Sequence, residues 1–125
     1  MVTRPLDYFY IVATIVFTVY GQLILKWRIV KFGPLPVDSF EKLKFLLLLL
    51  VDPVIFSGFA AAFLASLAWM AAMTKFDLSH AYPFMSLNFV VVVLLSGWLL
   101  GEPLTFQRVI GVGLIVLGTA VAGRG

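Results

Sequence analysis

Four long apolar stretches divide the chain, and they constrain its fold more than any other feature. They run over residues 8–25, 54–74, 81–100 and 108–123, and Arg108 is the one charged residue within these limits. A helix needs roughly 20 predominantly apolar residues to cross the hydrocarbon core of a bilayer. The pattern therefore predicts an all-α integral membrane protein, a single domain (residues 1–125) with four transmembrane helices.

The composition points the same way. Hydrophobic residues make up 62% of the chain and charged residues 12%, whereas a soluble domain carries about a quarter charged residues. Too few polar side chains are present to cover a water-facing surface. The composition excludes disordered, collagen-like, disulfide-stapled and ordinary soluble classes of protein.

The segment between the first two apolar stretches is too short to span a membrane. It begins with charged residues and ends in the apolar run Leu46 to Leu50. We predict a short interfacial helix over about residues 39–51, with Asp38 or Ser39 as its N-cap. Pro53 then separates it from the second span. The alternative interpretation is that the segment lengthens a tilted second span.

Basic residues are distributed unequally between the two expected sides of the membrane. The first and third loops hold six of them, and the remaining three lie on the other side: Arg4, Lys75 and Arg124. This bias favours a cytoplasmic first loop with both termini outside. The margin is modest, and the opposite orientation stays open.

The sequence offers few groups for catalysis. It has no cysteine and one histidine, His80, which lies close to Asp77 and Ser79 at the start of the third stretch. Neighbours on a helix start point in different directions, so we interpret Asp77 or Ser79 as an N-cap rather than part of a triad. Carboxylate clusters, phosphate-binding glycine loops and basic–aromatic patterns are missing. We predict no enzymatic activity and no bound metal, cofactor or nucleic acid.

Polar side chains are rare within the apolar stretches. In the first stretch Thr18, Gln22 and Lys26 follow one another by one helical turn and share a face. In the third, Tyr82 and Ser86 share a face, and Asn88 lies on a different one. For the uncharged polar residues, the competing interpretation is hydrogen bonding between helices. For Lys26 it is anchoring at the membrane surface.

Small residues indicate close helix packing. The second stretch is rich in alanine, and the last carries Gly111 and Gly118, seven residues apart and therefore on one face. Such faces favour contact between helices. Because four helices can barely surround a substrate path, we expect a dimer with Gly111 and Gly118 at its interface.

Three motifs link the chain to a known superfamily. They are Gly21-Gln22-Leu23-Ile24-Leu25-Lys26, the run Ala81-Tyr82-Pro83-Phe84-Met85-Ser86-Leu87-Asn88-Phe89-Val90, and Gly101-Glu102-Pro103-Leu104-Thr105. With these motifs the chain resembles the drug/metabolite transporter superfamily, near the small multidrug resistance proteins and the EamA-like group. The run from Ala81 resembles subunits thought to flip undecaprenyl-phosphate-linked aminoarabinose across the bacterial inner membrane.

One position departs from the small multidrug antiporters. These proteins carry a membrane-embedded glutamate one turn before the glycine that aligns with Gly21, and this chain has Thr18 there. A hydroxyl does not titrate at physiological pH. Proton-coupled export of cationic drugs is therefore disfavoured.

The resemblance implies an anionic lipid-linked sugar as substrate. Lys26, Arg28 and Lys31 would meet its phosphate at the membrane surface. A sugar would contact the polar side chains of the spans, namely Thr18, Gln22, Tyr82, Ser86 and Asn88, with Trp69 stacking on its ring. Glu102 would suit an amino group, or it would pair with Arg108.

The resemblance also implies the setting. The chain would lie among the lipids of the bacterial inner membrane as a multi-pass protein, in a homodimer or in a heterodimer with a related four-span subunit. Two other functions stay open: a small exporter of metabolites or cations, and a non-transporting membrane partner of a glycosyltransferase.

Overall fold

The computed structural model describes residues 4–124, which fold into helices without strands. The α-helices are α1 (Tyr8–Ile29), α2 (Ser39–Val51), α3 (Pro53–Lys75), α4 (Leu78–Met85), α5 (Leu87–Leu99) and α6 (Phe106–Arg124). Short 3-10 turns, Pro5–Asp7 and Val30–Phe32, flank α1. Four helical segments are long and apolar enough to cross a membrane: Pro5–Phe32, Pro53–Lys75, Leu78–Leu99 and Phe106–Arg124. The predicted all-α membrane fold is confirmed.

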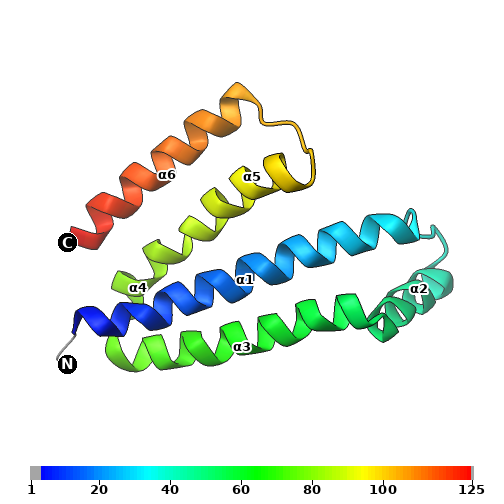
Figure 1. Cartoon of the computed structure of the whole chain (residues 1–125), viewed down its shortest axis with the longest axis horizontal. Helices are drawn as coiled ribbons and strands as arrows, with labels where there is room; N and C mark the ends of the chain where they lie inside the picture. Colours follow the sequence, from blue (N-terminus) through cyan, green and yellow to red (C-terminus); the bar gives the residue numbers. More distant parts are fainter. Residues whose placement is uncertain (1–3, 125) are drawn as a thin grey trace.

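The helices α1 and α3 form the tightest pair, and they lie side by side along their length (Figure 1). Their backbones approach closely at Gly21, where a Cβ atom would lie 3.0 Å from the carbonyl oxygen of Gly58. The buried face of α3 is made of small residues at helical spacing, including Gly58, Ala61 and Ala65. Side chains this small allow two helices to pack backbone against backbone in a bilayer.

The second half of the chain forms a separate layer against α1. The helix α6 packs on α4 and α5, and α5 in turn packs on α1 (Figure 1). The end of α6 lies at the same end of the molecule as the start of α1 and the end of α3 (Figure 1).

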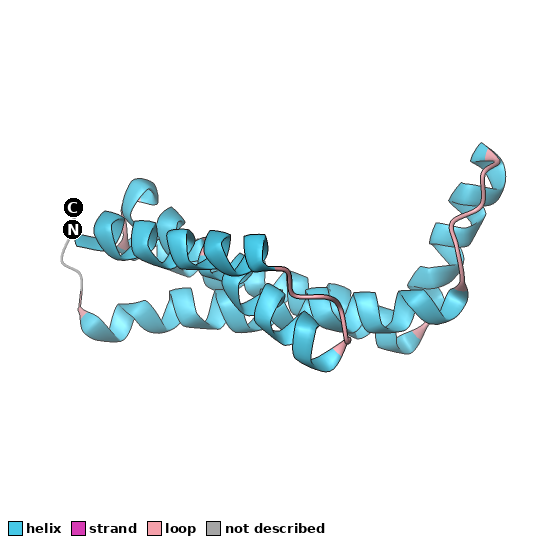
Figure 2. Cartoon of the chain, turned by 90° about the horizontal axis from the view of Figure 1, so that it is seen from above, coloured by secondary structure: helices cyan, strands magenta, loops and turns pink. Residues whose placement is uncertain are grey.

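The helix α2 is distinct from α3. Asp38 is its N-cap and accepts a hydrogen bond from the backbone N–H of Glu41 at 3.3 Å. The backbone is extended at Asp52, and Pro53 is the first residue of α3. Figure 2 shows that α2 turns away from the direction of α3, so the segment does not continue the second span as a straight helix.

The third span is broken, although its sequence predicts a continuous helix over residues 81–100. The N–H of Ser86 donates to Pro83 O, and the N–H of Phe89 donates to Ser86 O, each at 3.1 Å. Both bonds span three residues instead of four, which tightens the chain between α4 and α5. Pro83 lacks an N–H and interrupts the ladder within α4. The break divides the third span into α4 and α5.

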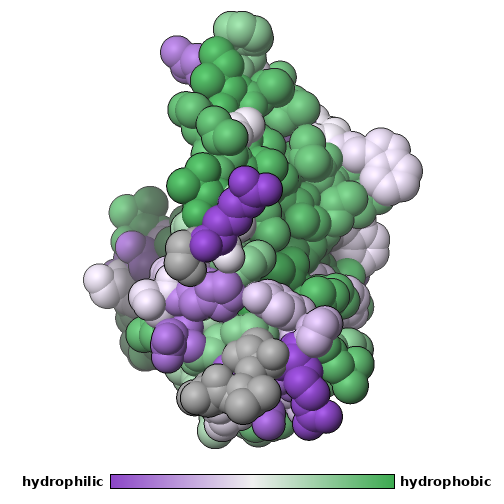
Figure 3. Space-filling view, turned by 90° about the vertical axis from the view of Figure 1, so that its left-hand side faces the viewer, coloured by the Kyte–Doolittle hydropathy of each residue, from purple (hydrophilic) through white to green (hydrophobic). Residues whose placement is uncertain are grey.

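The surface has the polarity that a bilayer requires. Figure 3, which looks onto the end with both termini, shows hydrophilic side chains gathered there and hydrophobic surface on the flank above. Large apolar side chains such as Trp98 and Phe106 are each 78% exposed. Such a surface is stable against lipid, where apolar side chains need no cover.

Candidate functional site

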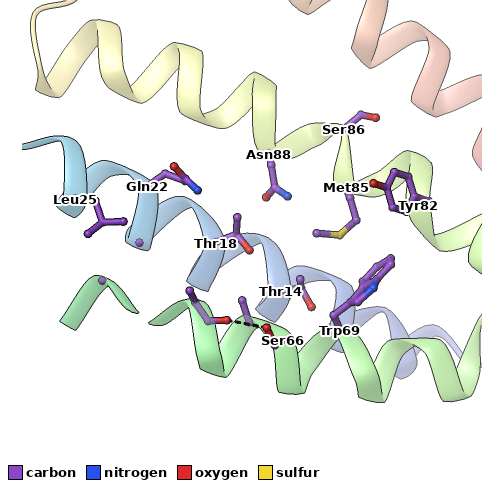
Figure 4. Close-up of a pocket in the computed structure, with 14 residues that line it drawn as sticks. Thr14, Thr18, Gln22, Leu25, Ser66, Trp69, Tyr82, Met85, Ser86 and Asn88 are labelled. Atoms are coloured by element: carbon purple, nitrogen blue, oxygen red, sulfur yellow. Dashed lines mark hydrogen bonds between the residues drawn. The ribbon is translucent and has the colours of Figure 1, made fainter. Parts of the chain in front are cut away.

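A cavity of about 470 Å³ lies between α1, α3, α4 and α5 (Figure 4). Its lining includes six of the residues that the sequence singled out: Thr18, Gln22, Trp69, Tyr82, Ser86 and Asn88. Asn88 lines this cavity together with Tyr82 and Ser86. Its side chain and that of Ser86 leave the helix in different directions (Figure 4), in agreement with the different face that helical spacing predicts for Asn88.

The cavity also holds residues that the sequence analysis missed, notably Thr14, Ser66 and Met85. Thr14 lies one turn before Thr18, so the same periodicity that linked Thr18 and Gln22 could have found it. Ser66 on α3 and Met85 beside the break carry no comparable signal, because the packing of other helices brings them to the cavity.

The polar groups of the lining fall into two sets. The hydroxyls of Thr14 and Ser66 donate to backbone carbonyls four residues earlier, at 2.7 and 3.1 Å. In contrast, a second set makes no side-chain hydrogen bond within residues 4–124: Thr18, Gln22, Tyr82, Ser86 and Asn88. Polar groups left unpaired at membrane depth are costly and mark functional positions. The second set is therefore available to a polar ligand.

Among the described residues of this set, Asn88 is the one whose unpaired oxygen is buried. Its Oδ1 is shielded from solvent and has no hydrogen-bond partner among the described residues. In Figure 4 its amide projects from α5 into the space above Thr18 on α1. Trp69 and Tyr82 lie nearby with their ring centroids 6.1 Å apart in an edge-to-face pair, and they form an aromatic wall at one end of the cavity.

A second cavity of about 420 Å³ lies where α1 ends and α5 leads into the following loop. Its lining brings Lys26 and Lys31 together with Glu102, which is far from them in the sequence. The ammonium of Lys31 lies 3.7 Å from the centre of the Trp27 ring, a cation–π contact. Arg108 donates to the carbonyl of Pro103 at 2.8 Å, and Glu102 remains at the cavity. The two cavities are neighbours along α1, because Gln22 and Lys26 are one turn apart.

Arg28 lies in a different environment from Lys26 and Lys31. Its guanidinium binds Asp52 with two hydrogen bonds, Nε to Oδ2 at 3.1 Å and Nη2 to Oδ1 at 3.0 Å. These bonds lower the pKa of the Asp52 carboxyl below its ordinary value of 3.8, and the N–H of Ile55 acts in the same direction against the opposing effect of burial. Arg28 thus joins the end of α1 to the start of α3.

His80 belongs to an aromatic cluster at the end of the molecule that carries both termini. Its Nε2 and the hydroxyl of Tyr8 are 2.9 Å apart and share a hydrogen bond. The imidazole stacks on Phe76 and contacts Phe84 edge-on. Asp77 is the N-cap of α4, although its side chain forms no capping bond. This cluster ties α1 to the turn between α3 and α4.

Gly111 and Gly118, which the sequence predicts at a dimer interface, lie on α6. They line neither of the two cavities described above. A Cβ atom added at Gly111 or at Gly118 would meet no atom within 4 Å. Within residues 4–124, no three side chains of His, Cys, Asp or Glu lie close enough to hold a metal ion.

Comparison with known proteins places these features in a family. The chain is 36% identical over 104 residues to the probable 4-amino-4-deoxy-L-arabinose-phosphoundecaprenol flippase subunit ArnF of Erwinia tasmaniensis, covering 78% of this chain and 79% of the relative. It is 32% identical over 118 residues to the ArnF subunit of Aeromonas hydrophila, covering 93% and 78%. It is 28% identical over 103 residues to the ArnE subunit of Aeromonas hydrophila, covering 82% and 84%.

No solved structure matches the chain. The model of the EamA-like transporter family matches residues 8–124, nearly the whole sequence. With its four apolar helices and this match, the chain is a multi-pass membrane protein that belongs to the EamA-like transporter family.

Proposed function

We propose that this protein is a flippase subunit that moves an undecaprenyl-phosphate-linked sugar across the bacterial inner membrane, together with a related four-span subunit. The observation that carries this proposal is the cavity in which five polar side chains lack hydrogen-bond partners within the described residues. The printed names of the relatives, which are subunits of a flippase for a phosphoundecaprenol-linked aminosugar, support the same substrate class.

The cavity supplies what a sugar needs to cross a bilayer. Sugar hydroxyls lose their water on entering the membrane, and each one left unpaired would be costly. Thr18, Gln22 and Asn88 offer donors and acceptors at intervals along the path, while Trp69 offers an aromatic face. The lipid tail stays outside, in contact with the apolar flanks of the helices. Binding of the head group would thus replace hydrogen bonds to water by hydrogen bonds to protein.

The second cavity, called the charged cavity from here on, is lined by Lys26, Lys31 and Glu102. It suits the phosphate of such a lipid. Lys26 and Lys31 would hold the phosphate, and Glu102 would accept hydrogen bonds from an amino group on the sugar. Because Arg28 is engaged by Asp52, its part in this proposal is indirect: it holds the end of α1 and so positions the two lysines.

Proton-coupled drug export finds less support in this chain. The cavity between α1, α3, α4 and α5 has a neutral lining in the part of the chain that the structure describes, with Thr18 where the antiporters carry a glutamate. A cationic drug would find no counter-charge there, and a proton no acceptor that titrates near neutral pH. An uncharged lining suits a neutral polyol.

The test is a translocation assay in proteoliposomes. The full chain, alone or with a related four-span subunit, is reconstituted with an undecaprenyl-phosphate-linked aminosugar, and its transfer between leaflets is measured. Replacing both lysines, as Lys26→Gln with Lys31→Gln, is expected to reduce the rate by about a hundredfold or more, because each charge-assisted bond to phosphate is worth roughly 1.5–3 kcal/mol and about 1.4 kcal/mol is a factor of ten.

The matched control removes two exposed lysines of α2 instead, Lys42→Gln with Lys44→Gln, and should leave the rate near that of the wild type. Equal rates for both double variants would contradict the phosphate role. If wild-type protein moves no lipid but copurifies with a glycosyltransferase, a non-transporting role replaces the proposal.

A further inference from the structure

Asn88 stands out from the other polar residues of the cavity between α1, α3, α4 and α5. Its Oδ1 is shielded from solvent, and the amide makes no hydrogen bond within residues 4–124. A buried amide oxygen without a partner is unfavourable in a protein interior and more so in a membrane. The side chain nevertheless leaves α5 toward the cavity (Figure 4).

Asn88 follows directly after the break in the third span. Two backbone bonds at Ser86 span three residues instead of four, and Asn88 is the second residue of α5. Asn88 and Ser86 both line the cavity, but their side chains leave the helix in different directions, and it is Asn88 that points toward α1 (Figure 4). Thr119 on α6 donates to the carbonyl of Pro83 at 3.3 Å and so joins α6 to the same break.

The hydrogen-bonding groups of an amide determine which ligand it can recognise. An amide both accepts and donates hydrogen bonds, and a hydroxyl group does the same. Rotation about the bond between Cβ and Cγ presents either end of the Asn88 amide to the cavity. A phosphate offers acceptors alone, and it would find its partners at the ammonium groups of Lys26 and Lys31 instead.

We propose that Asn88 is a specificity-determining residue, whose amide pairs with a sugar hydroxyl and so distinguishes the glycosylated lipid phosphate from the bare one. This inference rests on the proposed function. It adds the residue that recognises the sugar by a hydrogen bond. The bare lipid phosphate leaves Asn88 unpaired, and the glycosylated lipid satisfies it. Discrimination then comes from the hydrogen bond that only the glycosylated lipid can supply to Asn88.

The experiment compares two lipids in proteoliposomes that contain the full chain with its partner subunit. One is an undecaprenyl-phosphate-linked sugar, and the other is undecaprenyl phosphate alone. We expect the wild type to prefer the glycosylated lipid and Asn88→Leu to reduce the ratio of the two rates about tenfold, mainly by slowing the glycosylated lipid. Asn88→Ser, which keeps a group that donates and accepts, should retain part of the preference.

The control is Ser96→Ala on the same helix, where the hydroxyl already donates to Val93 O at 3.1 Å and lies outside the cavity. It should keep the wild-type ratio. A wild-type ratio in Asn88→Leu would overturn the inference and leave the proposed function intact. A wild-type protein that moves neither lipid would overturn both. Size-exclusion profiles and thermal unfolding of each variant in detergent establish that a changed ratio does not reflect misfolding.

Discussion

At the scale of single residues, Asp52 and Arg28 illustrate how a role arises from distant neighbours. Asp52 accepts a hydrogen bond from the N–H of Ile55 at 3.1 Å and so caps α3, and it also binds the guanidinium of Arg28. Its side chain is only 9% exposed. The pair holds the end of α1 against the junction of α2 and α3. Lys26, which lines the charged cavity, lies in the same last turns of α1.

Acid is expected to weaken this junction. Because the folded pKa of Asp52 lies below 3.8, the stabilisation from its charged form is present above pH 3.8 and is lost as the pH falls through the folded pKa. Asp52→Asn should lower the melting temperature near neutral pH. The variant should also lose less stability than the wild type when the pH falls below 3.8. Thermal unfolding in detergent from neutral to acid pH measures both effects. Asp38→Asn, which leaves a capping residue at the start of α2 and touches no ion pair, should keep the acid-dependent loss of the wild type. Parallel pH profiles for the wild type and both variants would refute the assignment.

At the scale of helices, the crossing of α1 and α3 depends on two glycines. A Cβ atom at Gly21 would lie 3.0 Å from the backbone oxygen of Gly58, and one at Gly58 would lie equally close to side-chain atoms of Ile24 and Leu25. Backbone cannot move aside as a flexible side chain can. The Gly21 contact therefore sets how closely the two helices approach and, with them, the width of the cavity that both line.

Gly21→Ala is expected to reduce the free energy of unfolding by about 1–3 kcal/mol, the usual cost of overpacking a close contact. The matched variant is Gly111→Ala, where the added methyl meets nothing within 4 Å. It should be neutral or stabilising by up to about 1 kcal/mol, because alanine favours a helix over glycine. Denaturant titration in mixed micelles compares the two, and equal losses of stability would disprove the role of the crossing.

At the scale of the whole molecule, α6 has an apolar face that the rest of the described chain leaves uncovered. It packs on α4 and α5, and its outer apolar side chains, among them Leu114, Leu117 and Val121, are more than 60% exposed. Lipid or a second subunit would cover them. We propose that a second four-span subunit does so at Gly111 and Gly118, where the helix backbone is open to close approach.

The combined variant Gly111→Leu with Gly118→Leu should therefore shift the protein from dimer toward monomer in crosslinking experiments within native membranes. The control is Gly113→Leu, since Gly113 lies on a different face of α6 and is equally open. Crosslinking that responds equally to both changes would exclude this face as the interface.

The sequence by itself determined the class of the protein and its four helical spans. Hydrophobic length and the need to satisfy the backbone in lipid are local properties, so each apolar stretch could be interpreted without knowing its neighbours. The separation of α2 from α3 was equally local, because Pro53 and the capping residue Asp52 lie next to each other. Thr18 and Gln22 could be placed on one face for the same reason.

Only the tertiary structure decided which polar groups meet. Asn88 on α5 and Tyr82 on α4 line one cavity together with residues of α1 and α3, and spacing within the third span does not show how those helices pack. Arg28 is bound by Asp52 rather than placed with Lys26, because α3 begins beside the end of α1. Contacts between helices depend on rotation and crossing, which arise from packing across the whole bundle, so no single stretch of sequence carries them.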